Sequence, residues 1–73
     1  MSVETRCKVD ILVNGETLAT SAATLHELVA ERGLAGARIA TARNGTFVPE
    51  RARAMTALQA GDRIEIVSPR HGG

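Results

Sequence analysis

The sequence predicts a small α+β domain in which one main helix packs across one face of a mixed sheet of four to five strands. Apolar and polar residues alternate near both ends of the chain, which is typical of half-buried strands. One stretch with helical spacing lies between them, and two Asn-Gly pairs mark tight hairpin turns. With 73 residues, the chain is long enough for a single domain spanning 1–73.

The first twenty residues predict a hairpin that follows a loose lead-in over residues 1–6. The residues that alternate onto one face of its first strand are Cys7, Val9, Ile11 and Val13. Asn14-Gly15 then predicts a type I′ turn, because that turn needs positive φ at both positions. A short strand over residues 16–20 completes the hairpin.

A helix of about nine residues is predicted next, because the apolar spacing changes after residue 20. Thr24 and Glu27 form a capping-box pattern at its start. Leu25, Leu28 and Val29 fall on one stripe, and Gly33 is placed for a left-handed C-terminal cap. We expect the stripe to pack on the hairpin, since so short a helix is not stable alone.

The second half predicts further strands that complete the sheet. The expected segments are a strand at 38–43, the Asn44-Gly45 turn, a strand at 46–48 ended by Pro49, a loop or helical turn at 50–56, and a strand at 63–67. Ile64 and Ile66 should point inward. A right-handed helical crossover would set a later strand parallel to the first, which is the β-grasp arrangement of ubiquitin.

The composition argues against an enzyme with an enclosed active site. Phe47 is the sole aromatic residue, and a pocket of roughly 300–1,000 Å³ would hollow out so small a core. We therefore assign no catalytic residue and no metal site. The net charge of +1 is no footprint for nucleic acid, although residues 1–37 carry −2 and residues 38–73 carry +3.

Cys7 is the single cysteine, so no intramolecular disulfide can form. Its alternation with Val9 and Ile11 favours a small buried residue over a sulfur relay. The chain has neither an apolar run of about 20 residues nor a signal peptide at its start. We expect a cytoplasmic protein that is monomeric when free and does not associate with membranes.

Residues 68–73 predict a flexible C-terminal tail. Pro69 cannot continue a strand ladder, and Gly72 and Gly73 have no side chain to anchor. The reactive group of such a tail is the α-carboxylate of Gly73, which two residues without Cβ atoms would let into a narrow channel. A carboxylate needs activation, and the chain has no phosphate-binding glycine loop, so a partner must activate it.

Four motifs and the terminal Gly72-Gly73 carry a resemblance to a known family. They are Ile-Leu-Val-Asn-Gly-Glu (11–16), Thr-Leu-His-Glu-Leu (24–28), Ala-Arg-Asn-Gly-Thr-Phe-Val-Pro (42–49) and Gly-Asp-Arg-Ile-Glu-Ile-Val (61–67). Over residues 8–73 the chain resembles the ThiS family, the sulfur carrier proteins of thiamine biosynthesis with a ubiquitin-like β-grasp fold. It departs from the family in about seven extra N-terminal residues and in Glu50, where a basic residue often follows Val-Pro.

The resemblance implies a carrier cycle at Gly73. A ThiF-like adenylyltransferase would use ATP and Mg²⁺ to convert the Gly73 carboxylate to an acyl-adenylate. A sulfur donor such as a cysteine desulfurase would then leave a thiocarboxylate, and thiazole synthase ThiG would accept the sulfur. The carrier itself would bind no cofactor.

The remaining candidate residues would contact these partners. Gly72, His71 and Arg70 would thread into partner active sites with Gly73, and a docking role is assigned to Phe47, Val48 and Arg63, with core packing as the alternative for Phe47. His26 is expected on the helix surface. The other arginines weighed for an acidic partner face are Arg51 and Arg53.

Two other classes of function stay open at this stage. One is a β-grasp carrier in molybdopterin synthesis or tRNA thiolation, or a protein modifier joined to lysines through Gly73. The other is a plain interaction module that binds RNA, which lacks support because the chain has no basic stripe with stacking aromatics.

Overall fold

The computed structural model of the protein describes residues 8–68. In chain order its elements are β1 (Val9–Val13), β2 (Glu16–Thr20), α1 (Leu25–Glu31), β3 (Ala40–Arg43), β4 (Thr46–Val48), the 3-10 helix η1 (Glu50–Met55) and β5 (Arg63–Val67). The predicted strands are confirmed, but the third begins at Ala40 instead of residue 38. Helix α1 has seven residues, fewer than expected. No helix within residues 8–68 is long and apolar enough to cross a membrane.

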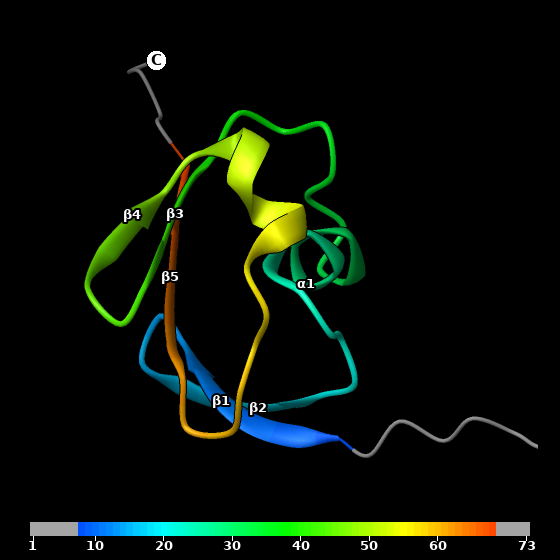
Figure 1. Cartoon of the computed structure of the whole chain (residues 1–73), viewed down its shortest axis with the longest axis vertical. Coiled ribbons are helices and arrows are strands. Elements are labelled where there is room, and N and C mark those ends of the chain that lie inside the picture. Colours follow the sequence, from blue (N-terminus) through cyan, green and yellow to red (C-terminus); the bar gives the residue numbers. More distant parts are fainter. Residues whose placement is uncertain (1–7, 69–73) are drawn as a thin grey trace, which may run out of the picture.

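The five strands form one mixed sheet in the order β2-β1-β5-β3-β4. Strands β1 and β5 run parallel, and the other neighbouring pairs run antiparallel. Figure 1 shows β5 passing through the middle of the sheet, with α1 and η1 on one side of it. The predicted α+β class and the β-grasp topology are confirmed.

The core lies between the sheet and α1. Its buried residues are Ile11, Val13, Leu25, Leu28, Val29, Val48 and Ile64. The helix stripe predicted from the sequence is therefore buried, and Ile64 points inward as expected, while Ile66 is partly buried against this core. No helix among residues 8–68 covers the other face of the sheet, where Phe47 and Val67 are exposed.

The helix ends show the predicted capping chemistry. The Thr24 hydroxyl accepts a hydrogen bond from the Glu27 amide, and the Glu27 carboxylate accepts one from the amide of Ala23, one residue before the cap. At the other end Gly33 has a φ of +76°, the left-handed conformation that glycine adopts without strain. These contacts satisfy backbone groups that a short helix leaves free.

Both Asn-Gly turns have the predicted backbone conformation. Asn14 and Asn44 have φ values of +52° and +51°, and the glycine after each has a φ of about +86° and +85°. Asparagine tolerates this region because its short side chain can hydrogen-bond locally. The two turns bring β2 back along β1 and β4 back along β3.

Arg53 lies inside the protein, so the exposed partner contact weighed for it is a wrong assignment. Its side chain is 7% exposed, and Nε donates to the Thr41 hydroxyl at 3.1 Å while Nη2 donates to the carbonyl of Ile39 at 2.9 Å. The Thr41 hydroxyl donates in turn to the carbonyl of Val48 at 2.8 Å. Arg53 therefore joins η1 to Thr41 of β3 and to Ile39, the residue before β3, through neutral acceptors.

We expect Arg53→Ala to lower the free energy of unfolding by about 2 kcal/mol, because it removes two hydrogen bonds from a charged donor and leaves the Ile39 carbonyl unpaired. The free energy of unfolding of Arg53→Lys should lie between those of Arg53→Ala and the unchanged protein, since lysine has one amino group in place of the guanidinium. Urea unfolding followed by far-UV circular dichroism measures both values. Equal stability of all three proteins would show that the buried guanidinium contributes nothing.

Candidate functional site

The residues assigned to the carrier chemistry lie outside residues 8–68. They are Arg70, His71, Gly72 and Gly73, and Cys7 also falls outside the described part of the chain. The structure therefore describes the strand that leads to them and the surface around it. Strand β5 ends at Val67, and Ser68 is the last residue described after it.

The uncovered sheet face carries an apolar surface beside the end of β5. Cross-strand partners point to the same face of a sheet, and the pairs Ala42–Phe47 and Ala40–Val67 join β4, β3 and β5. Phe47 is 64% exposed and Val67 is 58% exposed. We call Phe47, Ala40, Ala42 and Val67 the outer patch.

The structure separates the three residues assigned to docking. Phe47 lies on the outer patch, and core packing, its alternative, is excluded by its exposure. Val48 is 7% exposed and belongs to the core, so its docking assignment is wrong: neighbours along a strand point to opposite faces. Arg63 is exposed and lies at the start of β5, at the other end of the strand from Val67.

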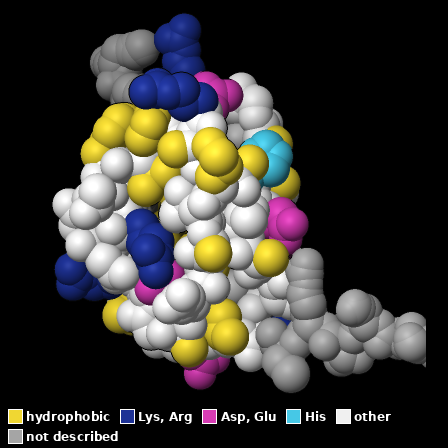
Figure 2. All heavy atoms as spheres, in the orientation of Figure 1, with side chains coloured by type: hydrophobic (Ala, Val, Ile, Leu, Met, Phe, Trp, Pro, Cys, Tyr) yellow, Lys and Arg dark blue, Asp and Glu magenta, His cyan; other side chains and the backbone are white. Residues whose placement is uncertain are grey.

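Exposed arginines lie at the end of the molecule where β5 ends. Glu50 lines two adjoining hollows, one with Arg38 and Ala40 and the other with Arg51 and His26. Ala40 pairs with Val67, which places the first hollow next to the last residue of β5. Figure 2 shows basic side chains, with acidic colour beside them, at this end of the surface. His26 is exposed, as expected.

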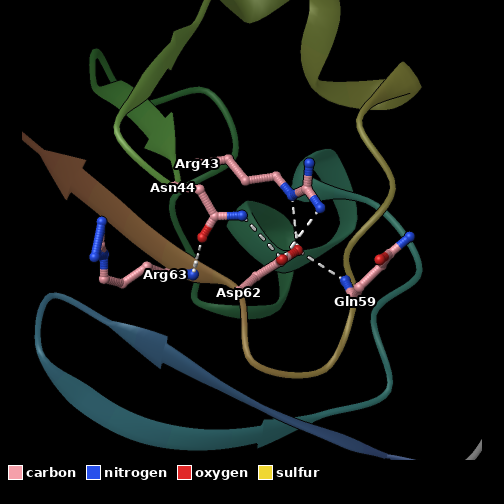
Figure 3. Close-up of polar contacts among 5 residues, drawn as sticks. All are labelled: Arg43, Asn44, Gln59, Asp62 and Arg63. Atoms are coloured by element: carbon pink, nitrogen blue, oxygen red, sulfur yellow. Dashed lines mark hydrogen bonds and ion pairs between the residues drawn. The ribbon is translucent and has the colours of Figure 1, made fainter.

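The start of β5 is fixed by a buried carboxylate that the sequence reasoning did not single out. Asp62 is 5% exposed and accepts from Arg43 Nε at 2.7 Å and Nη2 at 3.1 Å, from Asn44 Nδ2 at 3.1 Å and from the Gln59 amide at 2.8 Å. Figure 3 shows these donors converging on the carboxylate from the β3–β4 turn and from the loop before β5. The sequence feature that could have indicated this carboxylate is the Gly61-Asp62 pair at the start of the motif at residues 61–67.

Burial by itself would raise the pKa of Asp62. The hydrogen bonds from Arg43, the Gln59 amide and Asn44, with the charge of Arg43, outweigh this effect and lower the pKa of Asp62 below its ordinary value. The hydrogen bond to Asp62 also raises the pKa of Arg43, against the opposing effect of burial. The pair is therefore ionised throughout the neutral range.

Two asparagines hold β5 from opposite sides. The backbone amide of Asn44 donates to the Arg63 carbonyl at 2.7 Å, and the side-chain Oδ1 of Asn44 accepts from the Arg63 backbone amide at 2.8 Å. On the other side, Asn14 Oδ1 accepts from the Ile66 amide at 2.9 Å, and Nδ2 donates to the Ile66 carbonyl at 3.2 Å. The sequence assigned these asparagines to turns and gave no sign of their side-chain contacts.

Within residues 8–68, no group of three or more His, Cys, Asp or Glu side chains is placed to hold a metal ion. What the described site offers is a rigid central strand, an exposed apolar patch and a basic end beside the last residue of that strand. These features suit contact with another protein.

Comparison with known proteins gives the family. No curated protein matches the sequence. The structure resembles the crystal structure of a thiamine biosynthesis protein (ThiS) from Geobacter metallireducens, with a TM-score of 0.75 and 25% sequence identity over 89% of this chain and 100% of that chain. A sequence model of the ThiS family matches residues 4–73. This match covers nearly the whole chain and includes both terminal glycines, and the chain belongs to the ThiS family.

Proposed function

We propose that this protein is a sulfur carrier of thiamine biosynthesis that works through the terminal carboxylate of Gly73. The observation that carries the proposal is the ThiS family match, which extends through Gly72 and Gly73. The structural likeness to a thiamine biosynthesis protein supports the same pathway. In this role the protein is a substrate carried between enzymes.

The proposed chemistry activates a carboxylate that is a poor electrophile by itself. In a ThiF-like adenylyltransferase with ATP and Mg²⁺, a carboxylate oxygen of Gly73 attacks the α-phosphorus of ATP, and pyrophosphate leaves. A persulfide on a cysteine desulfurase then attacks the carbonyl carbon and AMP leaves with the bond electrons, after which a thiol reduces the acyl disulfide so formed and releases the thiocarboxylate. The resulting thiocarboxylate gives its sulfur to thiazole synthase ThiG.

The outer patch is proposed as the docking surface for the adenylyltransferase. It includes Val67, and five residues separate Val67 from Gly73 along the chain, so an enzyme that receives Gly73 comes within reach of this face. The apolar side chains of Phe47 and Val67 would lose contact with water there. The nearby Arg38 and Arg51 suit an enzyme whose site holds the negative charge of ATP.

Intact mass spectrometry tests the proposal. After incubation with the adenylyltransferase, ATP, Mg²⁺ and sulfide, we expect a gain of about 16 Da, because one carboxylate oxygen is replaced by sulfur. A chain lacking Gly73 and a reaction without ATP are the controls, and neither should gain mass. An unchanged mass for the full chain with an active adenylyltransferase would overturn the carrier function.

The pathway is tested separately by removing the gene. A requirement for the thiazole moiety supports thiamine biosynthesis. Loss of molybdoenzyme activity without that requirement would replace the thiamine assignment with a carrier function in molybdopterin synthesis.

A further inference from the structure

Strand β5 extends beyond the end of its parallel neighbour β1. On the β1 side, the Leu12 amide donates to the Asp62 carbonyl and the Asn14 amide donates to the Ile64 carbonyl, both at 2.9 Å. The chain then turns at Gly15 toward β2. The next rung of this parallel ladder would fall at Ile66, where β1 no longer has a backbone group to offer.

The Asn14 side chain supplies that missing rung. Its carboxamide has the same donor and acceptor as a peptide group, and it bonds to both the amide and the carbonyl of Ile66. The contact spans 52 positions in the sequence and depends on the left-handed backbone of Asn14, which aims the side chain along β5. On the other side of the strand, Val67 pairs with Ala40 of β3. Ile66 is thus the last residue of β5 with a partner on both sides, Asn14 on one and Thr41 of β3 on the other, while Val67 is paired with β3 alone.

We propose that Asn14 is a positioning residue for Gly73. It fixes the end of β5 and so sets the point from which the remaining chain reaches into the adenylating site. This inference rests on the proposed function. Without the Asn14 side chain, Ile66 has no partner on the β1 side, and the end of β5 is held only by its pairing with β3. Adenylation is sensitive to such a change, because misplacement by about 1 Å can lower a rate by about 100-fold.

The contacts between Asn14 and Ile66 are exposed to solvent, so their removal should leave the fold intact. Asn14→Gly deletes the side chain and retains the positive φ of the turn. Asn14→Asp keeps the acceptor for the Ile66 amide but places a carboxylate against the Ile66 carbonyl. Asn44→Gly is the matched control, since it makes the same change in the other hairpin and removes contacts from the start of β5.

Amide hydrogen exchange in the free carrier measures how well the Ile66 amide at the end of β5 is protected. In Asn14→Gly we expect exchange at Ile66 to be at least 10-fold faster, with a smaller increase in Asn14→Asp. In Asn44→Gly, we expect the Ile66 amide to exchange no faster than global unfolding of that variant allows. Equal protection of Ile66 in Asn14→Gly and the unchanged protein would overturn the inference.

Steady-state adenylation, measured as pyrophosphate release, reads out the positioning. For Asn14→Gly we expect kcat about 10-fold lower with KM for the carrier within about 2-fold, because the outer patch is unchanged and the defect persists at saturation. A chain with two glycines inserted after Ser68 should show the same kcat loss with normal exchange at Ile66. Asn44→Gly, assayed where it is fully folded, should keep its kcat.

The outcomes separate the two proposals. If the unchanged protein is adenylated and Asn14→Gly reacts with the same kcat, the positioning role of Asn14 is overturned and the carrier function stands. A kcat loss that is equal in Asn14→Gly and Asn44→Gly also overturns it, since the cause is then general stability. If the unchanged protein is not adenylated by an active enzyme, the carrier function fails and the inference fails with it.

Discussion

Asp62→Ala is expected to remove most of the free energy that stabilises the fold at 25 °C. The substitution removes a carboxylate that is 5% exposed. The Arg43 guanidinium, the Asn44 side-chain amide and the Gln59 backbone amide then lose the acceptor of their hydrogen bonds. Removing one partner of a fully buried ion pair costs about 3–5 kcal/mol, and because the Arg43 side chain is 30% exposed, the cost here is at the lower end, about 3 kcal/mol. A domain of this size is stabilised by only about 3–5 kcal/mol, so the substitution removes most of its free energy of unfolding. Far-UV circular dichroism is the appropriate measurement, since the chain has neither Trp nor Tyr.

Asp10→Ala is the control for this prediction. Asp10 is an exposed aspartate in β1, so its replacement should change the free energy of unfolding by less than about 0.5 kcal/mol. Similar stabilities of the Asp62 and Asp10 variants would contradict the structural role of the buried carboxylate.

The same carboxylate makes stability depend on pH. The pKa of Asp62 is lowered in the folded protein, whereas an unfolded aspartate titrates near about 3.9. Its contribution is therefore complete above pH 4 or so and is lost as the pH falls through the folded pKa. Asp62→Asn should be less stable at neutral pH and should lose less stability on acidification. A parallel acid dependence of the two proteins would contradict this origin.

Phe47→Glu is expected to weaken binding to the adenylyltransferase by at least about 10-fold, because a buried aromatic at the centre of an interface contributes about 2 kcal/mol or more. The side chain is 64% exposed in the free protein, so the fold should persist. A higher KM for the carrier in the adenylation assay, with kcat preserved at saturation, is the expected result. Circular dichroism confirms folding of the variant.

Met55→Glu is the matched control for the docking surface. Met55 is 79% exposed, and it lies on η1, away from the outer patch. The two substitutions put the same charge in place of a large exposed apolar side chain. An equal rise of KM in both variants would show that the outer patch is not the docking surface.

The local structure was predictable because short-range patterns determine it. The capping box at Thr24 and the helix stripe of Leu25, Leu28 and Val29 were read correctly, as were both Asn-Gly turns. A right-handed crossover predicted that a later strand would pair in parallel with the first, and the structure shows that this strand is β5. These features depend on neighbouring residues or on general rules of chain topology.

The side-chain contacts across the sheet were not predictable, because they depend on strand register. Strand β4 has three residues, too few to show which of Phe47 and Val48 points inward. The bonds from Arg43 to Asp62 and from Asn14 to Ile66 join residues 19 and 52 positions apart. Arginine is usually exposed, so nothing local marked Arg53 as buried. The residues assigned to sulfur chemistry stay predictions, since they lie outside residues 8–68.

The central position of β5 has a consequence for biosynthesis. The strand in the middle of the sheet is the last one within residues 8–68, so a growing chain has β1 and β3 with nothing between them until residues 63–67 are made. Proteins are synthesised from the N-terminus, and pairing between distant segments is slow. The sheet therefore closes late during translation, and a chain that stops before residue 63 has no route to the native fold. Truncated copies should be left to proteolysis, and they would not compete with the intact carrier for its enzymes.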